Sequence, residues 1–150
     1  MLTKRIKEAI DIFLDAINNG TLVKGDPCGC AVGNLLAGAQ GITLTKEPYL
    51  KGVKIKPDYN GDWYDMGCRL LKLMAEKTEF THQQLLKIER TFENNTSITH
   101  TVYNEYTKEE IRADQIKGLE AVIELMLTFD EQKENIKEIF TNKANLIPVI

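Results

Sequence analysis

One stretch decides the fold of this chain: Asp26-Pro27-Cys28-Gly29-Cys30-Ala31-Val32-Gly33-Asn34-Leu35-Leu36-Ala37-Gly38. It begins as a turn, because aspartate and proline favour turning and Pro27 has no backbone N–H to donate. It then becomes small and apolar, with glycines at 29, 33 and 38. Small side chains let a helix approach its neighbours closely. The stretch therefore predicts a short helix, ending near Gly41, that runs through the centre of a helical domain.

The composition is that of an ordinary globular domain. The chain has 150 residues, of which 43% are hydrophobic and 27% charged, and its net charge is −3. This charge favours neither nucleic acid nor an anionic membrane as a partner. No apolar run is long enough to cross a bilayer, and the first residues are charged where a signal peptide would be apolar. With three cysteines and no secretion signal, we expect a cytoplasmic protein with reduced thiols.

Further helices follow from apolar residues that recur at helical spacing. The first predicted helix runs from Leu2 to Ile17 and stops at Gly20. A later one runs from about Trp63 to Lys77, and four of its apolar side chains are expected to be buried: Met66, Leu70, Leu73 and Met74.

Helix start signals organise the second half of the chain. Thr81 with Gln84, and Thr107 with Glu110, match the capping box, in which each side chain binds the other residue's backbone N–H. The first box begins a helix and the second begins the longest helix of the chain. Asp130 is expected to cap a last helix. The buried stripe of that helix is predicted to comprise Ile136, Ile139 and Phe140.

Two segments leave the strand content open. Val53 and Ile55 alternate with lysines, which permits one short strand, and residues 96–106 are rich in threonine and β-branched side chains. The second segment is either a partner strand or an extended loop. The sequence thus predicts a mainly α fold: a single compact domain over residues 1–150, with about six helices and room for one short two-stranded β element.

The C-terminal residues 146–150 are apolar except that Pro148 interrupts them. Pro148 stops a helix and favours an extended path for the residue before it. We expect this tail to lie in a groove, either on its own domain or on a partner copy, so a homo-oligomer is one outcome. The alternative is a docking peptide that orders on another protein.

The cysteines are the first candidates for chemistry. Cys28 and Cys30 lie at a predicted helix start, where the helix dipole lowers a thiol pKa. A catalytic cysteine also needs a base, and His82 or His100 would have to lie beside it in space. The Cys-x-Cys spacing does not match a structural zinc site, which uses two wider pairs. We therefore predict no metal site, no cofactor and no assigned catalytic residue.

Binding residues are predicted in two places. The start of the central helix offers backbone amides to a small anionic ligand. A loop with four lysines (46, 51, 54 and 56) also carries aromatic side chains, the residue types of a stacking platform. The negative net charge disfavours nucleic acid there, which leaves a protein or a small anion as the partner. The predicted ligand- or partner-binding residues are Cys28, Cys30, Asn34, Tyr59, Trp63 and Tyr64.

Three segments carry a resemblance to a known group of proteins. They are residues 80–93 (FTHQQLLKIERTFE), residues 114–122 (DQIKGLEAV) and residues 30–34 (CAVGN). They resemble small uncharacterised helical proteins encoded by Bacteroidetes-type bacteria and their phages. The resemblance implies a bacterial or phage origin and an accessory role, and it implies no activity.

The sequence favours a non-enzymatic helical binding protein. On this interpretation it is a phage or mobile-element accessory factor that acts on a bacterial host protein or a nucleotide signal. The alternative is a cysteine-dependent or metal-dependent enzyme that uses Cys28 or Cys30 with a nearby histidine. A cleft joining a cysteine to a histidine or a carboxylate would indicate the enzyme, and an exposed patch that is apolar or of one charge sign would indicate the binding protein.

Overall fold

The computed structural model describes residues 2–22, 24, 31–39, 76–132 and 135–149. These residues form helices and contain no strand, which confirms the prediction of a mainly α fold. The predicted strand at residues 53–55 and most of the predicted helix at 63–77 lie outside the described residues. The elements are α1 (Lys4–Asn19), α2 (Ala31–Ala39), α4 (His82–Asn94), the 3₁₀ helix η2 (His100–Glu105), α5 (Lys108–Phe129) and α6 (Ile136–Asn145).

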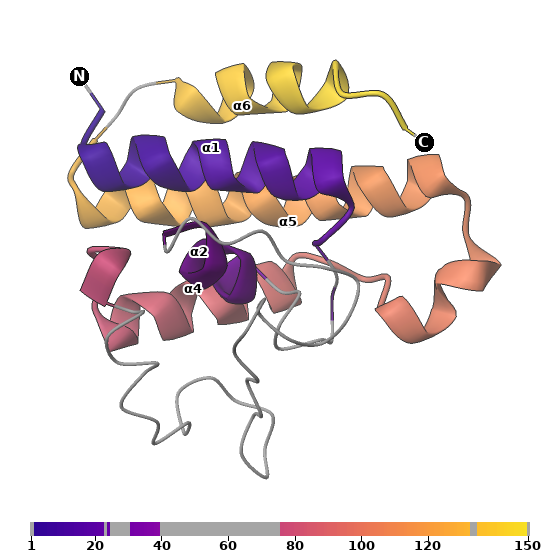
Figure 1. Cartoon of the computed structure of the whole chain (residues 1–150), viewed down its shortest axis with the longest axis horizontal. Coiled ribbons are helices and arrows are strands. Elements are labelled where there is room, and N and C mark those ends of the chain that lie inside the picture. Colours follow the sequence, from indigo (N-terminus) through magenta and orange to yellow (C-terminus); the bar gives the residue numbers. More distant parts are fainter. Residues whose placement is uncertain (1, 23, 25–30, 40–75, 133–134, 150) are drawn as a thin grey trace, which may run out of the picture.

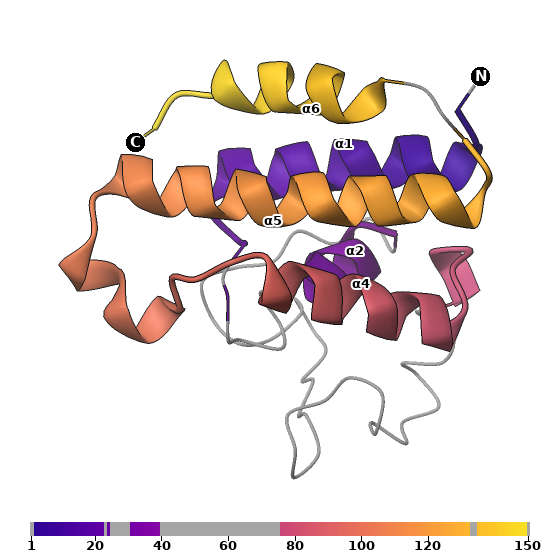
Figure 2. The same ribbon diagram turned by 180° about the vertical axis from the view of Figure 1, so that it is seen from behind.

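The helices stack in three layers (Figure 1). Helices α1 and α5 lie side by side and antiparallel in the middle layer, and α6 covers them on one side. Helices α2 and α4 lie on the other side, as the view from behind also shows (Figure 2). Helix α5 contacts α1, α4 and α6, so it is the central element of the bundle.

Side chains from all five of the described α-helices meet in one hydrophobic core. Its largest fully buried members are three phenylalanines from three layers: Phe13 of α1, Phe92 of α4 and Phe140 of α6. Helix α5 adds a broad buried face, which is typical of a helix that packs against several others. A single core is what one compact domain requires.

Helix α2 lies where its composition predicts. Every residue from Ala31 to Ala37 is buried. At Gly38 an added Cβ would lie 2.5 Å from Cγ1 of Ile12, so α1 can approach α2 this closely only because the residue is glycine. The described part of the opening stretch therefore does run through the interior of a helical domain.

The predicted helix ends are also confirmed. At Gly20, α1 stops in the left-handed region (φ 67°), and the N–H of Thr21 donates to the carbonyl of Ala16 at 3.0 Å. Both capping boxes form. The hydroxyl of Thr81 accepts from the N–H of Gln84 at 3.1 Å, and the hydroxyl of Thr107 accepts from the N–H of Glu110 at 3.1 Å.

Two predictions about α6 are wrong. Asp130 does not cap it: Asp130 is the C-cap of α5, while α6 begins at Ile136 with Asn135 before it. Ile139 is not part of the buried stripe, since 50% of it is exposed. Helix α6 packs through one side only, and Ile136, Phe140 and Ala144 fill that side.

Residues 96–106 form no strand. Thr99 is extended, and the chain then turns through η2 before α5 begins. The structure thus favours a loop over the alternative of a partner strand at this position. The Oδ1 and Oδ2 atoms of Asp114 accept from the N–H of Ser97 at 2.9 and 3.1 Å, which fixes the loop against α5.

The C-terminal tail is partly docked. Ile147 packs against the core, and Nη1 of Arg112 donates to its carbonyl oxygen at 2.8 Å. Leu146 is mostly in solvent, with 82% of its surface exposed, and Val149 is 39% exposed. Within the described part of the tail, the predicted docking on the chain's own domain is confirmed for Ile147, and Ile150 lies outside the described residues.

A close approach between α4 and α5 depends on Gly118. An added Cβ there would lie 2.9 Å from Cδ2 of Phe92 and closer still to the methyl group of Thr96. Both neighbours are buried, and the Thr96 hydroxyl is held by the Phe92 carbonyl at 2.8 Å. Neither neighbour can move without disturbing the core.

We expect Gly118→Leu to lower the free energy of unfolding by about 1–3 kcal/mol through overpacking. Lys117→Leu, which places the same side chain at the neighbouring exposed position of α5, should change it by less than about 0.5 kcal/mol. Urea unfolding followed by circular dichroism measures both. Equal stability of the two variants would contradict the close packing at Gly118.

The tail offers a second matched pair. Ile147→Asn should lower the free energy of unfolding by about 1–2 kcal/mol, because a partly buried aliphatic side chain is lost from the core. Leu146→Asn should have no effect on the melting temperature, because that side chain makes little contact with the domain. The reverse order of melting temperatures would show that the tail is docked differently.

Candidate functional site

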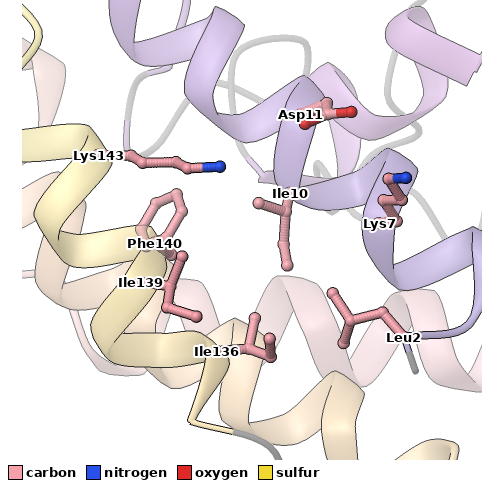
Figure 3. A pocket seen from close by; sticks show the side chains of 8 residues that line it. All are labelled: Leu2, Lys7, Ile10, Asp11, Ile136, Ile139, Phe140 and Lys143. Atoms are coloured by element: carbon pink, nitrogen blue, oxygen red, sulfur yellow. The ribbon is translucent and has the colours of Figure 1, made fainter.

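A small groove separates α1 from α6 (Figure 3). Apolar side chains line its base and charged side chains line its rim. Its volume is about 140 Å³. The residues that line it are Leu2, Lys7, Ile10, Asp11, Ile136, Ile139, Phe140 and Lys143.

Helical spacing brings these residues together. On α1, Lys7, Ile10 and Asp11 are three and four residues apart, so they share one face. On α6 the lining positions 136, 139, 140 and 143 follow the same rule. In Figure 3 Ile10 faces Ile139 and Phe140 across the gap. The two helices thus supply opposite walls.

The side chains that line the groove are buried at its base and exposed at its rim. Ile10, Ile136 and Phe140 are buried and belong to the core. Ile139 stands at the edge, and half of its surface is exposed to solvent. An apolar side chain in that position is available to another molecule.

The rim carries charges of both signs. Lys7 and Asp11 of α1 and Lys143 of α6 are exposed. Among the residues that the structure describes, none of these three side chains forms an ion pair or a hydrogen bond. They are therefore free to pair with charges on a bound molecule.

The volume of the groove limits what it can hold. Sites for small molecules and cofactors usually enclose about 300–1,000 Å³. An apolar cavity of about 150 Å³ is known to hold one benzene ring. The groove therefore suits a single aromatic ring or one large aliphatic side chain, and it is too small for a nucleotide.

Of the binding residues predicted from sequence, the structure describes Asn34 alone. Cys28, Cys30, Tyr59, Trp63 and Tyr64 fall outside the described residues, so their roles stay predictions. Asn34 is described and buried in α2. Its Oδ1 accepts from the Thr21 hydroxyl at 2.8 Å, and its Nδ2 donates to the Thr21 carbonyl at 3.1 Å. These bonds tie α2 to the turn after α1, and the groove does not include Asn34.

The two histidines are far apart. His82 begins α4 and His100 begins η2, after α4 has ended, and the 13 residues of α4 span about 20 Å. Nδ1 of His100 lies 2.9 Å from the Lys24 carbonyl. In the part of the chain that the structure describes, no three His, Cys, Asp or Glu side chains gather in a way that could hold a metal ion.

The side chains of a polar cluster near Lys24 form hydrogen bonds within the fold. Nζ of Lys24 donates to the carbonyls of Glu93 (2.8 Å) and Thr96, and the Gln115 amide donates to the Leu22 carbonyl at 2.5 Å. The Gln115 amide also donates to the hydroxyl of Tyr103, and burial raises the pKa of that tyrosine. These bonds hold Leu22 and Lys24, which follow α1, against α4 and α5.

A second charged cluster surrounds Arg5. Nε of Arg5 donates to both carboxylate oxygens of Asp130, at 3.1 and 3.0 Å, and the two side chains are only 17% and 10% exposed. Nη1 donates to the Glu79 carbonyl at 2.8 Å and to the Gln84 amide oxygen at 3.1 Å. The guanidinium also lies 4.6 Å from the ring centroid of Phe80. Every contact joins elements of the fold, so this cluster is structural.

The groove residues carry a weak signal in the sequence. Apolar residues at helical spacing on α6 are followed by four more large apolar residues in the tail, which is more than one helix face can bury. That excess indicates an exposed apolar surface. It does not indicate that α1 supplies the second wall, because α1 lies more than a hundred residues earlier in the sequence.

No protein-family model, curated protein or solved structure matches this chain. Among the described helices, none is both long enough and apolar enough to cross a membrane.

The Arg5 cluster leads to a prediction about pH. The hydrogen bonds from Arg5 hold the pKa of Asp130 below the usual value for an aspartate, although burial opposes them. The carboxylate therefore stabilises the fold fully above the unfolded pKa of about 3.9, and this contribution is lost as the pH falls through the lower folded pKa.

Asp130→Asn should lower the free energy of unfolding by about 1.5–3 kcal/mol at neutral pH. The difference from the wild type should shrink in acid, below about pH 4. Asp15→Asn, at an exposed position of α1, should behave like the wild type at every pH. Urea unfolding across the pH range measures all three proteins, and a difference that is independent of pH would contradict this role.

Proposed function

We propose that this chain is a non-enzymatic helical protein that binds another protein through the groove between α1 and α6. One observation carries the proposal: an apolar groove of one-side-chain size lies beside the half-exposed Ile139. An anchor side chain that enters such a groove, with a charged rim around it, is how many protein interfaces obtain their affinity.

The size of the groove argues for a protein over a nucleotide as the bound partner. The proposal keeps the cytoplasmic location and the phage or mobile-element accessory role that the sequence indicates. That role includes action on a bacterial host protein. The groove alone does not specify such a partner.

Binding of a single side chain tests the proposal. We expect N-acetyl-leucinamide to shift the ¹H–¹⁵N NMR signals of Ile10, Ile139 and Phe140 at millimolar concentration, because the groove fits one aliphatic side chain. N-acetyl-glycinamide, which lacks that side chain, should leave these signals unchanged.

Two variants make the test specific to the groove. Ile139→Glu should abolish the shifts, because it places a charge at the edge of the apolar surface. Tyr106→Glu makes the same change at an exposed apolar residue outside the groove and should leave the shifts intact. Shifts that persist in Ile139→Glu, or that are absent at a protein concentration at which the chain is monomeric, would refute the proposal.

A further inference from the structure

The exposed apolar surface is concentrated at the C-terminal end of the described chain. Four large apolar residues of the described chain are exposed: Tyr106 (41%), Ile139 (50%), Leu146 (82%) and Val149 (39%). Three of the four lie on α6 or in the segment that follows it. Exposed apolar side chains that gather in one part of a chain are typical of an interaction surface.

Ile139 and Leu146 share one face of α6. Leu146 keeps helical backbone angles (φ −81°, ψ −14°), so the helical register continues to it. Seven residues turn an α-helix by about 700°, which is only about 20° short of two full turns. The two side chains are therefore aligned, about 10 Å apart along the helix axis.

The same chain thus carries both halves of a contact. The groove beside Ile139 accepts one large aliphatic side chain, and Leu146 is such a side chain with most of its surface in solvent. Leu146 cannot enter the groove of its own chain, because it lies two turns further along the same rigid helix. Only a second copy can bring a Leu146 to this groove.

We propose that the protein bound at the groove is a second copy of this chain, an inference that rests on the proposed function. The two α6 helices pack antiparallel, and Leu146 of each copy enters the groove beside Ile139 of the other. This arrangement is isologous: residue 139 meets residue 146 twice, around a two-fold axis. Because only one face of α6 forms the contact, the fraction of dimer should depend on the protein concentration.

The charges at the rim favour a second copy over a strongly charged partner. An acidic partner would meet Asp11, and a basic partner would meet Lys7 and Lys143. A second copy brings both signs, so Lys143 of one copy can pair with Asp11 of the other. Charge complementarity of this kind selects the partner more than it adds affinity.

The tail is already held in the conformation that the dimer uses. Arg112 donates to the carbonyl of Ile147 at 2.8 Å and to that of Pro148 at 3.3 Å. These bonds fix the backbone directly after Leu146, whose side chain stays in solvent. Little conformational entropy remains to be lost on binding.

Sedimentation velocity of the full chain over a range of concentrations tests the dimer. We expect a reversible monomer–dimer equilibrium for the wild type. Leu146→Glu and Ile139→Lys should each raise the dimer dissociation constant at least about tenfold. Tyr106→Glu is the matched control and should leave it unchanged, and the melting temperatures of all variants should stay close to that of the wild type.

Mixing the two variants tests the pairing itself. In a mixture of Ile139→Lys and Leu146→Glu, one contact becomes a lysine–glutamate pair and the other stays Ile139 with Leu146. The mixture should therefore dimerise at least about tenfold more tightly than either variant alone. A mixture that associates no better than its components would overturn the antiparallel pairing.

The remaining outcomes separate the two proposals. A wild type that stays monomeric up to millimolar concentration, or a dimer that both variants leave intact, refutes the second copy as the occupant. If N-acetyl-leucinamide still binds the groove in that case, the protein-binding function stands with a different partner. If it does not bind, both proposals fail.

Discussion

The fold depends on the guanidinium group of Arg5. Arginine presents its donors in a rigid fork, and this one reaches Asp130 at the end of α5 and the carbonyl of Glu79 before α4. The first turn of α1 is thereby fixed to two other helices at one end of the bundle. Two residues in left-handed conformations, Glu79 (φ 64°) and Glu131 (φ 53°), lie beside these acceptors. Each such residue costs roughly 1–2 kcal/mol, which the contacts of the cluster must offset.

The Arg5 cluster positions the residues that line the groove. The backbone N–H of Thr3 donates to the Gln132 side chain at 3.2 Å, and the Thr3 hydroxyl donates to Asp130 at 2.6 Å. These bonds place Leu2, the neighbouring residue, at the edge of the groove. They also fix where the chain leaves α5 before it turns into α6. Both walls of the groove are therefore positioned from the same end of the bundle.

The sequence predicts local features well and distant ones poorly. The capping boxes at Thr81 and Thr107 and the stop at Gly20 depend on residues within one turn, so they are visible in the pattern. Asp130 also matches a local pattern, that of a helix N-cap. Its actual partner is 125 residues away, and no local rule can indicate that pairing.

In the candidate site, too, the sequence predicts local features and misses those that depend on distant residues. Periodicity identifies the apolar side of α6, but it cannot distinguish the buried Phe140 from the half-exposed Ile139 next to it. That distinction depends on how α6 is rotated against α1 and α5, which is set by packing. The sequence predicts Asn34 as a binding residue, and its buried bonds to Thr21 become visible only in three dimensions.

The distance in sequence between Arg5 and Asp130 also affects how the protein is made. Ribosomes add about 5–20 residues per second, so the 125 residues between them take roughly 6–25 s to synthesise. During that time the apolar face of α1, with Phe13 and Ile17, has neither α5 nor α6 to pack against. Helix α2 is the first partner to emerge, so α1 and α2 can pair early. The end of the bundle held by Arg5 closes last, and until then the nascent chain presents an apolar helix to chaperones.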